Sequence, residues 1–280
     1  MKQRAFKQVD VFTTVPYLGN PLAVVLDGTD LSTEDMQHFT DWTNLSEATF
    51  LLPPTHPDAD YHVRIFCPGR ELPFAGHPTL GTCHAWLQAG GKPKRKDTVV
   101  QECGLGLITL RRDGERLAFA APPLIRSGPL AEADVQLIAR GLGVDRADIV
   151  DHAWCDNGPN WRGVMLRSAE QVLALKPDGG LLAGLDIGVV GPYGKTNSDC
   201  AFEVRAFFPG NNGLAEDPVT GSLNAALAQW LIAAGLAPSQ YIASQGTAMG
   251  RAGRVFVVKD GGDIWIGGAS VTCIDGTVML

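Results

Sequence analysis

The chain has 280 residues, which is more than one domain usually contains, so two domains of about 100 to 150 residues are expected. No apolar run approaches the roughly 20 residues that span a bilayer, and this argues against a transmembrane helix. A net charge of -7 argues against a nucleic-acid-binding face, which would need clustered basic residues. Small molecules are therefore the expected partners, with no nucleic acid and no membrane.

Strand and helix signals alternate through the first 120 residues. Short apolar runs on either side of the turn-rich segment P-Y-L-G-N-P predict strands over 9–12 and 22–26. Ser32 predicts the N-cap of a helix, because Glu34 and Asp35 would lie in the first turn, where the helix dipole favours carboxylates. Asp113 and Gly114 predict a hairpin turn. Further strands are expected over 48–52, 61–66, 99–102, 107–111 and 116–120.

The proline-rich stretch over 121–130 interrupts this pattern and predicts a domain boundary. We expect an N-terminal lobe over 1–120, completed by a C-terminal strand within 268–280, and a C-terminal lobe over 121–267. The second lobe is expected to contain helices over 131–140 and 168–175 and strands over 164–166 and 201–208. A closing β meander is expected, with strands over 255–258, 264–266 and 271–274 and turns at 259–262 and 275–276.

An internal repeat is the strongest organising signal in the chain. The segment V-R-I-F-C-P-G at 63–69 returns as V-R-A-F-F-P-G at 204–210, with five of seven positions identical. The segment H-P-x-x-G-T at 77–82 then returns as D-P-x-x-G-S at 217–222. Each copy runs into an apolar helical segment. We interpret the chain as a duplication of one strand-loop-helix unit.

Each copy of the repeat is expected to begin a helix with proline in its first position, since the missing N–H would be unpaired there in any case. His77 and Asp217 would then occupy N-cap-like positions. Free backbone N–H groups and the positive dipole ends of these helices suit a carboxylate or a phosphate. Gly76 and Gly221 would let a ligand approach the backbone closely. The hydroxyls of Thr82 and Ser222 would add hydrogen-bonding groups.

Glu47 lies in N-L-S-E-A-T-F, between the expected end of a helix and an apolar strand. Partial burial there would raise the pKa of its carboxyl group toward a range useful in general acid-base catalysis, although the position taken alone favours an exposed glutamate. Asn20, in G-N-P, is open to two interpretations as well, because asparagine before proline is also good turn chemistry. Glu47, His77 and Asp217 together would suit proton transfer next to a conjugated acid.

Other catalytic signatures are missing from the sequence. The six cysteines contain no C-x-x-C pair and the histidines lack metal-ligand spacing, so we expect reduced thiols and no metal. G-L-G-L at 104–107 lacks the third glycine of a dinucleotide site, and neither a P-loop nor G-x-S-x-G occurs. The first ten residues have no apolar stretch typical of a signal peptide, which favours a cytoplasmic location.

Four motifs taken together resemble the PhzF family of phenazine-biosynthesis-like proteins. They are V-D-V-F-T-T-x-P-Y-x-G-N-P-L-A-V-V from Val9, N-L-S-E-A-T-F from Asn44, E-L-P-F-A-G-H-P-T-L-G from Glu71 and E-D-P-V-T-G-S-L-N from Glu216. They occur in order, and the resemblance extends to the closing segment at 267–271. Two departures concern the pocket: Cys67 stands where the family usually has threonine, and Leu223 where a smaller residue is common.

The resemblance implies an α+β fold like that of diaminopimelate epimerase, with two pseudo-symmetric lobes, each a β-sheet wrapped around a central helix, and an active site between them. It also implies a homodimer and an isomerase that acts on trans-2,3-dihydro-3-hydroxyanthranilate without a cofactor. Carried over by position, Glu47 is the acid/base and His77 and Asp217 flank it. The substrate-binding residues implied in the same way are Asn20, Gly76, Gly221 and Ser222.

Two alternatives stay open. An amino-acid epimerase or racemase of related architecture would need one cysteine in each half at equivalent positions, whereas the repeat aligns Cys67 with Phe208 and Cys83 with Leu223. A non-catalytic protein that binds a small acid would keep the pocket and lose turnover. The physiological substrate does not follow from the sequence.

Overall fold

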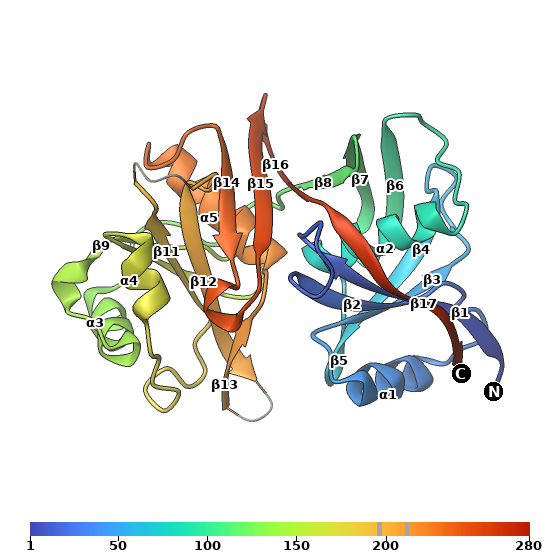
Figure 1. Ribbon diagram of the computed structural model, residues 1–280, viewed down its shortest axis with the longest axis horizontal. Helices are drawn as coiled ribbons and strands as arrows, with labels where there is room; N and C mark the ends of the chain where they lie inside the picture. Colours follow the sequence, from blue (N-terminus) through green and yellow to red (C-terminus); the bar gives the residue numbers. More distant parts are fainter. Residues whose placement is uncertain (195–197, 211–212) are drawn as a thin grey trace. The chain divides into compact units, whose positions relative to one another are not determined.

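The computed structural model describes residues 1–194, 198–210 and 213–280, which divide into two compact units. The first unit comprises Met1–Ala120 together with Gly267–Leu280, and the second comprises Ala121–Ile266. Each unit contains a mixed β-sheet and helices of its own (Figure 1). Within the described ranges, no helix has both the length and the hydropathy needed to cross a bilayer.

The first unit contains two helices and nine of the strands in the described chain. In chain order these elements are β1 (Gln3–Val11), β2 (Asn20–Val25), α1 (Thr33–Thr43), β3 (Ala48–Leu52), β4 (Tyr61–Cys67), β5 (Arg70–Leu72), α2 (Gly76–Gln88), β6 (Thr98–Cys103), β7 (Gly106–Asp113), β8 (Arg116–Ala120) and β17 (Ser270–Met279). The expected hairpin turn at Asp113 and Gly114 is confirmed, since it joins the antiparallel strands β7 and β8.

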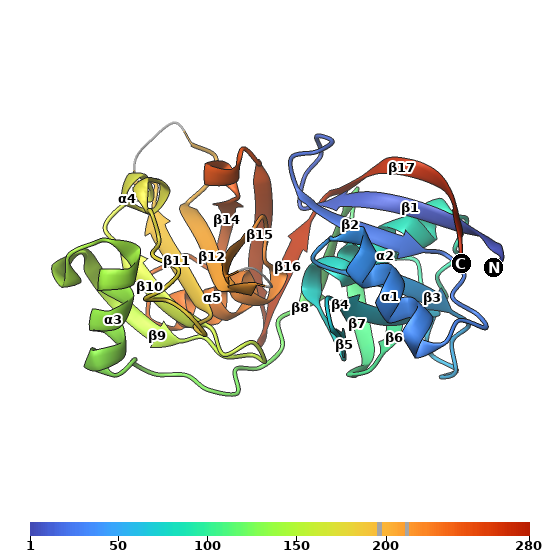
Figure 2. The same ribbon diagram turned by 90° about the horizontal axis from the view of Figure 1, so that it is seen from below.

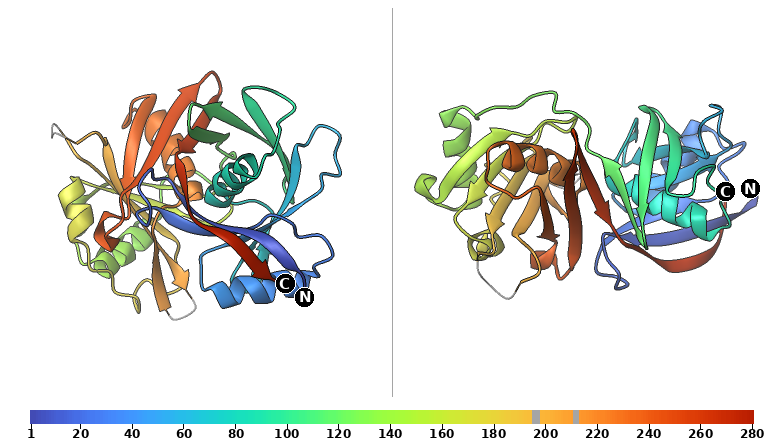
Figure 3. Two further views of the ribbon diagram at one scale, coloured as in Figure 1. Left: turned by 45° about the vertical axis from the view of Figure 1, so that its right-hand side comes forward. Right: turned by 90° about the horizontal axis from the view of Figure 1, so that it is seen from above.

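The sheet of the first unit wraps around helix α2. β1 pairs antiparallel with both β17 and β2, β2 runs parallel to β3, and β3 pairs antiparallel with β4. β4 then runs parallel to β6, and β6, β7 and β8 follow as antiparallel neighbours. α2 contacts β1, β2, β3, β6, β8 and β17, so strands meet it from several sides (Figure 3). Its first eight residues are all buried, which explains why the helix shows little separation of polar and apolar faces.

Helix α1 covers the other face of the same sheet and confirms the predicted N-cap. The Ser32 hydroxyl accepts a hydrogen bond from the backbone N–H of Asp35, and the Asp35 carboxylate accepts one from the backbone N–H of Ser32. The helix packs on β3 and β4 (Figure 2). Met36 and Phe39 bury their side chains there against Phe50, and this small core attaches α1 to the strand that follows Glu47.

The predicted turn at Asp275 and Gly276 is wrong. β17 continues through these residues to Met279 and pairs with the whole length of β1, so it does not extend a meander from the strand before it. The D-G signal is outweighed here because β17 pairs with β1 at nine positions, from Gln3 with Met279 to Val11 with Ser270. The two chain ends are joined by the same ladder, with Leu280 N–H donating to the carbonyl of Lys2 at 3.0 Å.

The second unit contains three α-helices and the other eight strands of the described chain. In chain order its elements are α3 (Glu132–Leu142), the 3₁₀ turn η1 (Arg146–Asp148), β9 (Ile149–Trp154), β10 (Arg162–Leu166), α4 (Ala169–Ala174), β11 (Ile187–Pro192), β12 (Phe202–Gly210), β13 (Gly213–Asp217), α5 (Gly221–Ala233), β14 (Gln240–Gln245), the 3₁₀ turn η2 (Thr247–Met249), β15 (Gly253–Asp260) and β16 (Asp263–Gly268). The last two residues of β16 belong to the first unit.

The strand pairings of the second unit repeat those of the first. β9 pairs antiparallel with β10, β10 runs parallel to β11, and β11 pairs antiparallel with β12. β12 then runs parallel to β14, and β14 pairs antiparallel with β15. The short strands β5 and β13 pair antiparallel with β4 and β12 in the same way. The order antiparallel, parallel, antiparallel, parallel, antiparallel is therefore common to both units.

Helices occupy corresponding places in the second unit as well. The apolar helix α5 is buried over most of its length and contacts β15. Its Leu223 side chain packs against Gly188 of β11. α4 packs on β10, β11 and β12, with Val172 in the core there. α3 packs on β9 through Val135 and Ile138. α5 is thus the counterpart of α2, and α4 is the counterpart of α1.

Candidate functional site

Glu47 is held immediately before a central strand of the first unit. α1 ends at Thr43, Asn44 turns the chain with a φ of 55°, and β3 begins at Ala48. Ala48 is paired on both sides, with Ala23 of β2 and with Phe66 of β4. The backbone next to Glu47 is therefore fixed, and its side chain is only 17% exposed.

His77 lies in the first turn of α2, but its predicted N-cap position is wrong. Ala75 is the N-cap, so His77 is the second helical residue and Pro78 the third. Proline is tolerated there because the N–H groups of the first turn have no partner within the helix, and the first turn therefore admits proline beyond its first position. The His77 side chain projects from this first turn and is only 5% exposed.

Glu47 and His77 are brought together by the fold. His77 Nδ1 lies 3.3 Å from Glu47 Oε2. Burial lowers the pKa of His77 to about 3, against a smaller opposing effect of a hydrogen bond with the backbone of Pro21. The imidazole is therefore neutral near pH 7 and can act as a hydrogen-bond donor through one nitrogen and an acceptor through the other. A carboxyl group beside a neutral imidazole is a pair that can pass a proton in either direction.

Asp217 has a different local setting from His77. It is the last residue of β13, and α5 begins only at Gly221 with Thr220 as its N-cap, so the predicted N-cap position of Asp217 is also wrong. Asp217 Oδ2 accepts a hydrogen bond of 2.6 Å from the Thr220 hydroxyl. The pairing of Asp217 with Ala206 extends β13 to this residue, and the strand delays the start of the helix.

A buried amide network that the sequence did not indicate holds this turn. Gln245, at the end of β14, is fully buried and donates from Nε2 to the backbone carbonyl of Asp217 at 3.1 Å and to Thr220 Oγ1 at 2.9 Å. Gln245 Oε1 accepts from the backbone N–H of Thr220 and from Asn224 Nδ2. Asn224 belongs to the E-D-P-V-T-G-S-L-N motif, so its side chain could have been suspected. The role of Gln245 could not have been suspected, because it is a single glutamine outside every sequence motif.

The first turns of α2 and α5 suit an anion. Within the described ranges, neither N-cap residue, Ala75 or Thr220, makes a side-chain hydrogen bond to its helix. The first backbone N–H groups of each helix, including those of Gly76 and Gly221, thus have no capping side chain, and the helix dipole favours negative charge at this end. Ligand binding by Gly76 and Gly221 stays a prediction.

The two hydroxyls of the repeat are used differently. Thr82 is fully buried and donates to Thr49 Oγ1 at 2.8 Å, so its hydroxyl proton is used within the fold. Ser222 is partly exposed, and its Oγ accepts a hydrogen bond of 3.1 Å from the indole N–H of Trp161. Asn20 is the first residue of β2, paired with Val11, and is fully buried.

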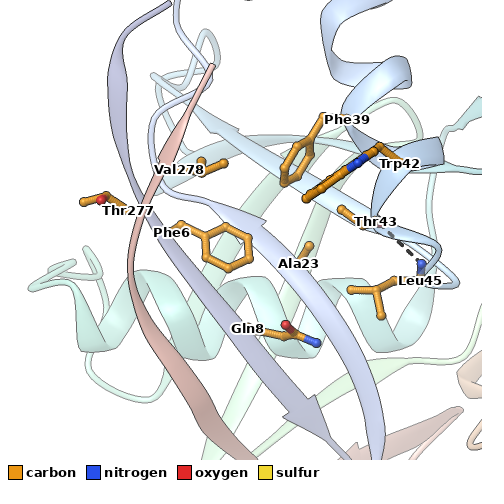
Figure 4. A pocket seen from close by; sticks show the side chains of 9 residues that line it. All are labelled: Phe6, Gln8, Ala23, Phe39, Trp42, Thr43, Leu45, Thr277 and Val278. Atoms are coloured by element: carbon orange, nitrogen blue, oxygen red, sulfur yellow. Dashed lines mark hydrogen bonds between the residues drawn. The ribbon is translucent and has the colours of Figure 1, made fainter.

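An apolar depression of about 250 Å³ lies elsewhere on the first unit and contains none of the predicted site residues (Figure 4). It is lined by Phe6, Gln8, Ala23, Phe39, Trp42, Thr43, Leu45, Thr277 and Val278. The ring of Trp42 is 81% exposed beside it. The polar side-chain groups that line this depression are one amide, two hydroxyls and the indole N–H of Trp42, so it offers no acid-base pair.

The cysteines are poorly suited to a two-thiol mechanism. All six are free. Cys83 is fully buried, and burial raises the pKa of its thiol to about 12; burial raises the pKa of Cys67 as well. Among the described residues, no group of three or more histidine, cysteine or acidic side chains is arranged to hold a metal ion.

Comparisons with known proteins place this geometry in a family. The family described as "Phenazine biosynthesis-like protein" matches residues 9–276. A Pseudomonas aeruginosa protein named trans-2,3-dihydro-3-hydroxyanthranilate isomerase is 34% identical over 258 residues, covering 90% of this chain and 89% of that one. A Schizosaccharomyces pombe protein named antisense-enhancing sequence 1 is also 34% identical, over 304 residues and the whole of both chains.

Solved structures show the same fold. A PhzF-family protein of Enterococcus faecalis superimposes with a TM-score of 0.82 at 24% identity over all of both chains. A hydroxyproline epimerase of Agrobacterium vitis superimposes with a TM-score of 0.59 at 13% identity, covering 99% of this chain and 91% of that one. The predicted α+β architecture, with a sheet wrapped around a central helix in each unit, is therefore confirmed as the diaminopimelate epimerase-like fold.

The fold and the family match define an isomerase. The chain belongs to the phenazine biosynthesis-like family, also called the PhzF family, as the four sequence motifs predicted.

Proposed function

We propose that this isomerase moves a proton between two carbon atoms of a small unsaturated carboxylic acid, with Glu47 as the acid/base and without a cofactor. The observation that carries the proposal is the contact of 3.3 Å between Glu47 Oε2 and His77 Nδ1, in side chains that are 17% and 5% exposed. A carboxyl group and a neutral imidazole that are shielded from water form a proton-transfer pair.

The proposed reaction conserves atoms. The Glu47 carboxylate takes a proton from one carbon, and the electron pair of that C–H bond shifts along the adjacent double bonds. The protonated carboxyl group, which exchanges its acidic proton with solvent, then gives a proton to a carbon further along. Glu47 therefore acts first as base and then as acid. Neutral His77 supports both stages, because its Nδ1 faces the carboxyl group and can share a proton with it in either state.

Groups at the two helix starts are proposed to bind the acid. Gly76 and Gly221 supply backbone N–H groups at helix ends that lack side-chain caps among the described residues, and Ser222 supplies a partly exposed hydroxyl. Asp217 is proposed as the further acidic group of the reaction, because its carboxylate is held by Thr220 at the start of α5. Asn20 is proposed to contact the substrate from the start of β2.

We propose trans-2,3-dihydro-3-hydroxyanthranilate as the first substrate to test, because relatives with 31% and 34% identity are named as isomerases of this compound. The test is proton NMR of the purified protein with this compound in deuterated buffer, for the wild type and for Glu47→Gln. We expect substrate ring signals to disappear with deuterium incorporation in the wild type and to persist in the variant.

Each other outcome has a definite meaning. If the wild type leaves the compound unchanged, the proposed substrate is wrong. If the compound binds without exchange or turnover, the chain is a small-acid-binding protein for this ligand. If Glu47→Gln reacts as fast as the wild type, the assignment of the acid/base is wrong, while the isomerase assignment stands.

We also propose that the protein works as a homodimer in the cytoplasm, as the resemblance implies. Sedimentation equilibrium should give twice the monomer mass of 29.8 kDa. A monomer mass across the micromolar range would contradict the dimer.

A further inference from the structure

The hairpin loop between β9 and β10 is tightly organised around Asp156. The Asp156 carboxylate Oδ1 accepts hydrogen bonds from the backbone N–H groups of Gly158 at 2.9 Å and Asn160 at 3.2 Å. Its backbone N–H and carbonyl are bonded to Arg126 and Ile125. A loop that is fixed at its base and at its tip can hold side chains in one orientation.

Two side chains of this loop bind opposite ends of Ser222 in the first turn of α5. The indole N–H of Trp161 donates to Ser222 Oγ at 3.1 Å, and Asn157 Nδ2 donates to the backbone carbonyl of Ser222 at 2.8 Å. Trp161 is 4% exposed, so its ring has a fixed place. Asn157 Oδ1 is buried and has no hydrogen-bond partner among the described residues, which is unusual for a side chain with a purely structural role.

The contact with Trp161 restricts what the Ser222 hydroxyl can do. An indole N–H can only donate, so it occupies one oxygen lone pair of Ser222 and leaves the hydroxyl proton directed elsewhere. An oxygen that accepts one hydrogen bond also becomes a better donor in the next. Ser222 is therefore prepared to donate, and it is partly exposed at a helix end that favours negative charge.

The first unit lacks this arrangement at the equivalent hydroxyl. Thr82 corresponds to Ser222 in the repeat, but it is fully buried and donates to Thr49. The loop that corresponds to Asn157–Trp161 is the segment around Asn20, since Asn20 and Asn160 are separated by the same 140 residues as His77 and Asp217. In the second unit this loop donates to a hydroxyl in the first turn of α5, through the indole N–H of Trp161.

We infer that Trp161 and Asn157 are positioning residues for the Ser222 hydroxyl, which they present as a donor to an anionic oxygen of the ligand. This rests on the proposed role of Ser222 in substrate binding. The ligand group that meets Ser222 is then a hydrogen-bond acceptor with negative charge, of which a carboxylate is the simplest. Neither residue is part of the proton-transfer pair, so their loss affects binding of the acid and leaves Glu47 and His77 in place.

Trp161→Phe tests this inference, because it keeps an aromatic ring and removes the N–H. The probes are 2-aminobenzoate, which carries a carboxylate, and neutral 2-aminobenzamide, with affinities measured by calorimetry. We expect about tenfold weaker binding of 2-aminobenzoate and an unchanged affinity for 2-aminobenzamide, since a hydrogen bond to a charged group is lost or misdirected. Trp230→Phe is the matched control, because Trp230 lies on α5 like Ser222 but packs its ring against Gly163. This variant should bind both probes as the wild type does.

A double-mutant cycle separates positioning from general packing. In the Ser222→Ala background, Trp161→Phe should weaken 2-aminobenzoate binding no further. An equal loss in both backgrounds, wild-type affinity of Trp161→Phe, or a wild type that does not bind 2-aminobenzoate would each overturn the inference.

Asn157→Ala provides a second variant if Trp161→Phe does not fold, and it should also weaken binding of the carboxylate selectively. These binding measurements need no turnover. A wild type that binds 2-aminobenzoate through Ser222 but leaves trans-2,3-dihydro-3-hydroxyanthranilate unchanged would therefore refute the proposed substrate and leave this inference intact.

Discussion

His77 and Asp217 occupy the same position in the repeated motif, yet their surroundings differ. His77 lies within the first turn of α2, is 5% exposed and contacts Glu47. Asp217 ends β13, four residues before α5, and accepts a hydrogen bond from Thr220. The two units share one order of strand pairings, so the topology does not require either side chain. The comparison teaches that a duplicated fold can keep its backbone while its motif residues diverge toward different chemistry.

The repeated arginine shows the opposite behaviour. Arg64 of β4 forms a two-pronged ion pair with Glu71 of β5, and Arg205 of β12 forms one with Glu216 of β13. Both arginines also bond to the helix that covers the sheet: Arg64 to Thr33 of α1, and Arg205 to the carbonyls at the end of α4. This contact is common to both units and is therefore structural.

The largest expected effect is a loss of kcat on substitution of Glu47 in the first unit, in contrast with a rise of KM on substitution of Ser222 in the second. Glu47→Gln should lower kcat by about 10³-fold, because acid-base catalysis contributes about 10² to 10⁴. Ser222→Ala should raise KM by about tenfold and change kcat little, because it removes one hydrogen bond to the bound acid. Steady-state kinetics on a confirmed substrate measures both. If both variants changed kcat and KM in the same proportion, the division of labour between the units would be wrong.

The ion pairs should differ in their contribution to stability. The Arg205 and Glu216 side chains are 7% and 17% exposed, whereas those of Arg64 and Glu71 are 22% and 38% exposed. Arg205→Ala should lower the free energy of unfolding by about 3 kcal/mol, since it leaves a poorly hydrated carboxylate without its partner. Arg64→Ala should cost about 1 kcal/mol. Urea unfolding measures both values, and equal losses would contradict the comparison.

The burial of His77 predicts a stability loss in acid. Its pKa is about 3 in the folded protein, below the ordinary value of 6.5, so the unfolded chain takes up this proton first. The stabilising contribution is complete above pH 6.5 and declines as the pH falls toward 3, by at most about 1.4 kcal/mol per pH unit. Urea unfolding at pH 7 and pH 4.5 should show a smaller difference for His77→Asn than for the wild type. The exposed His56→Asn is the control, and an unchanged pH dependence in His77→Asn would count against the burial of a neutral imidazole.

The smallest expected effect concerns the hydroxyl that only the first unit buries. Thr82→Val keeps the shape of the side chain and removes its bond to Thr49, so it should lower the free energy of unfolding by about 1 kcal/mol. KM should stay at the wild-type value, in contrast with Ser222→Ala. A rise of KM in Thr82→Val would show that this hydroxyl reaches the substrate after all.

Local signals in the sequence predicted several elements well. Ser32 and Asp35 form the expected capping box, and Asp113 with Gly114 forms the expected hairpin. Five strands were missed, β5, β9, β11, β13 and β14. β11 reads I-G-V-V-G-P, and its glycines and proline disfavour a strand, but both of its neighbours supply ladders that offset this cost. Hydrogen-bonded pairing with neighbouring strands, which local composition does not show, decided these strands.

The sequence by itself determined the family, the repeat and the identity of Glu47, His77 and Asp217 as residues of interest, because short motifs in a fixed order carry that information. The tertiary structure alone decided that Glu47 contacts His77 and that the Thr82 hydroxyl donates to Thr49. It also decided that Trp161 and Asn157 form hydrogen bonds with Ser222. The reason is physical: a residue's burial and hydrogen-bond partners depend on strands and loops that lie tens of residues away, and a linear motif does not encode them.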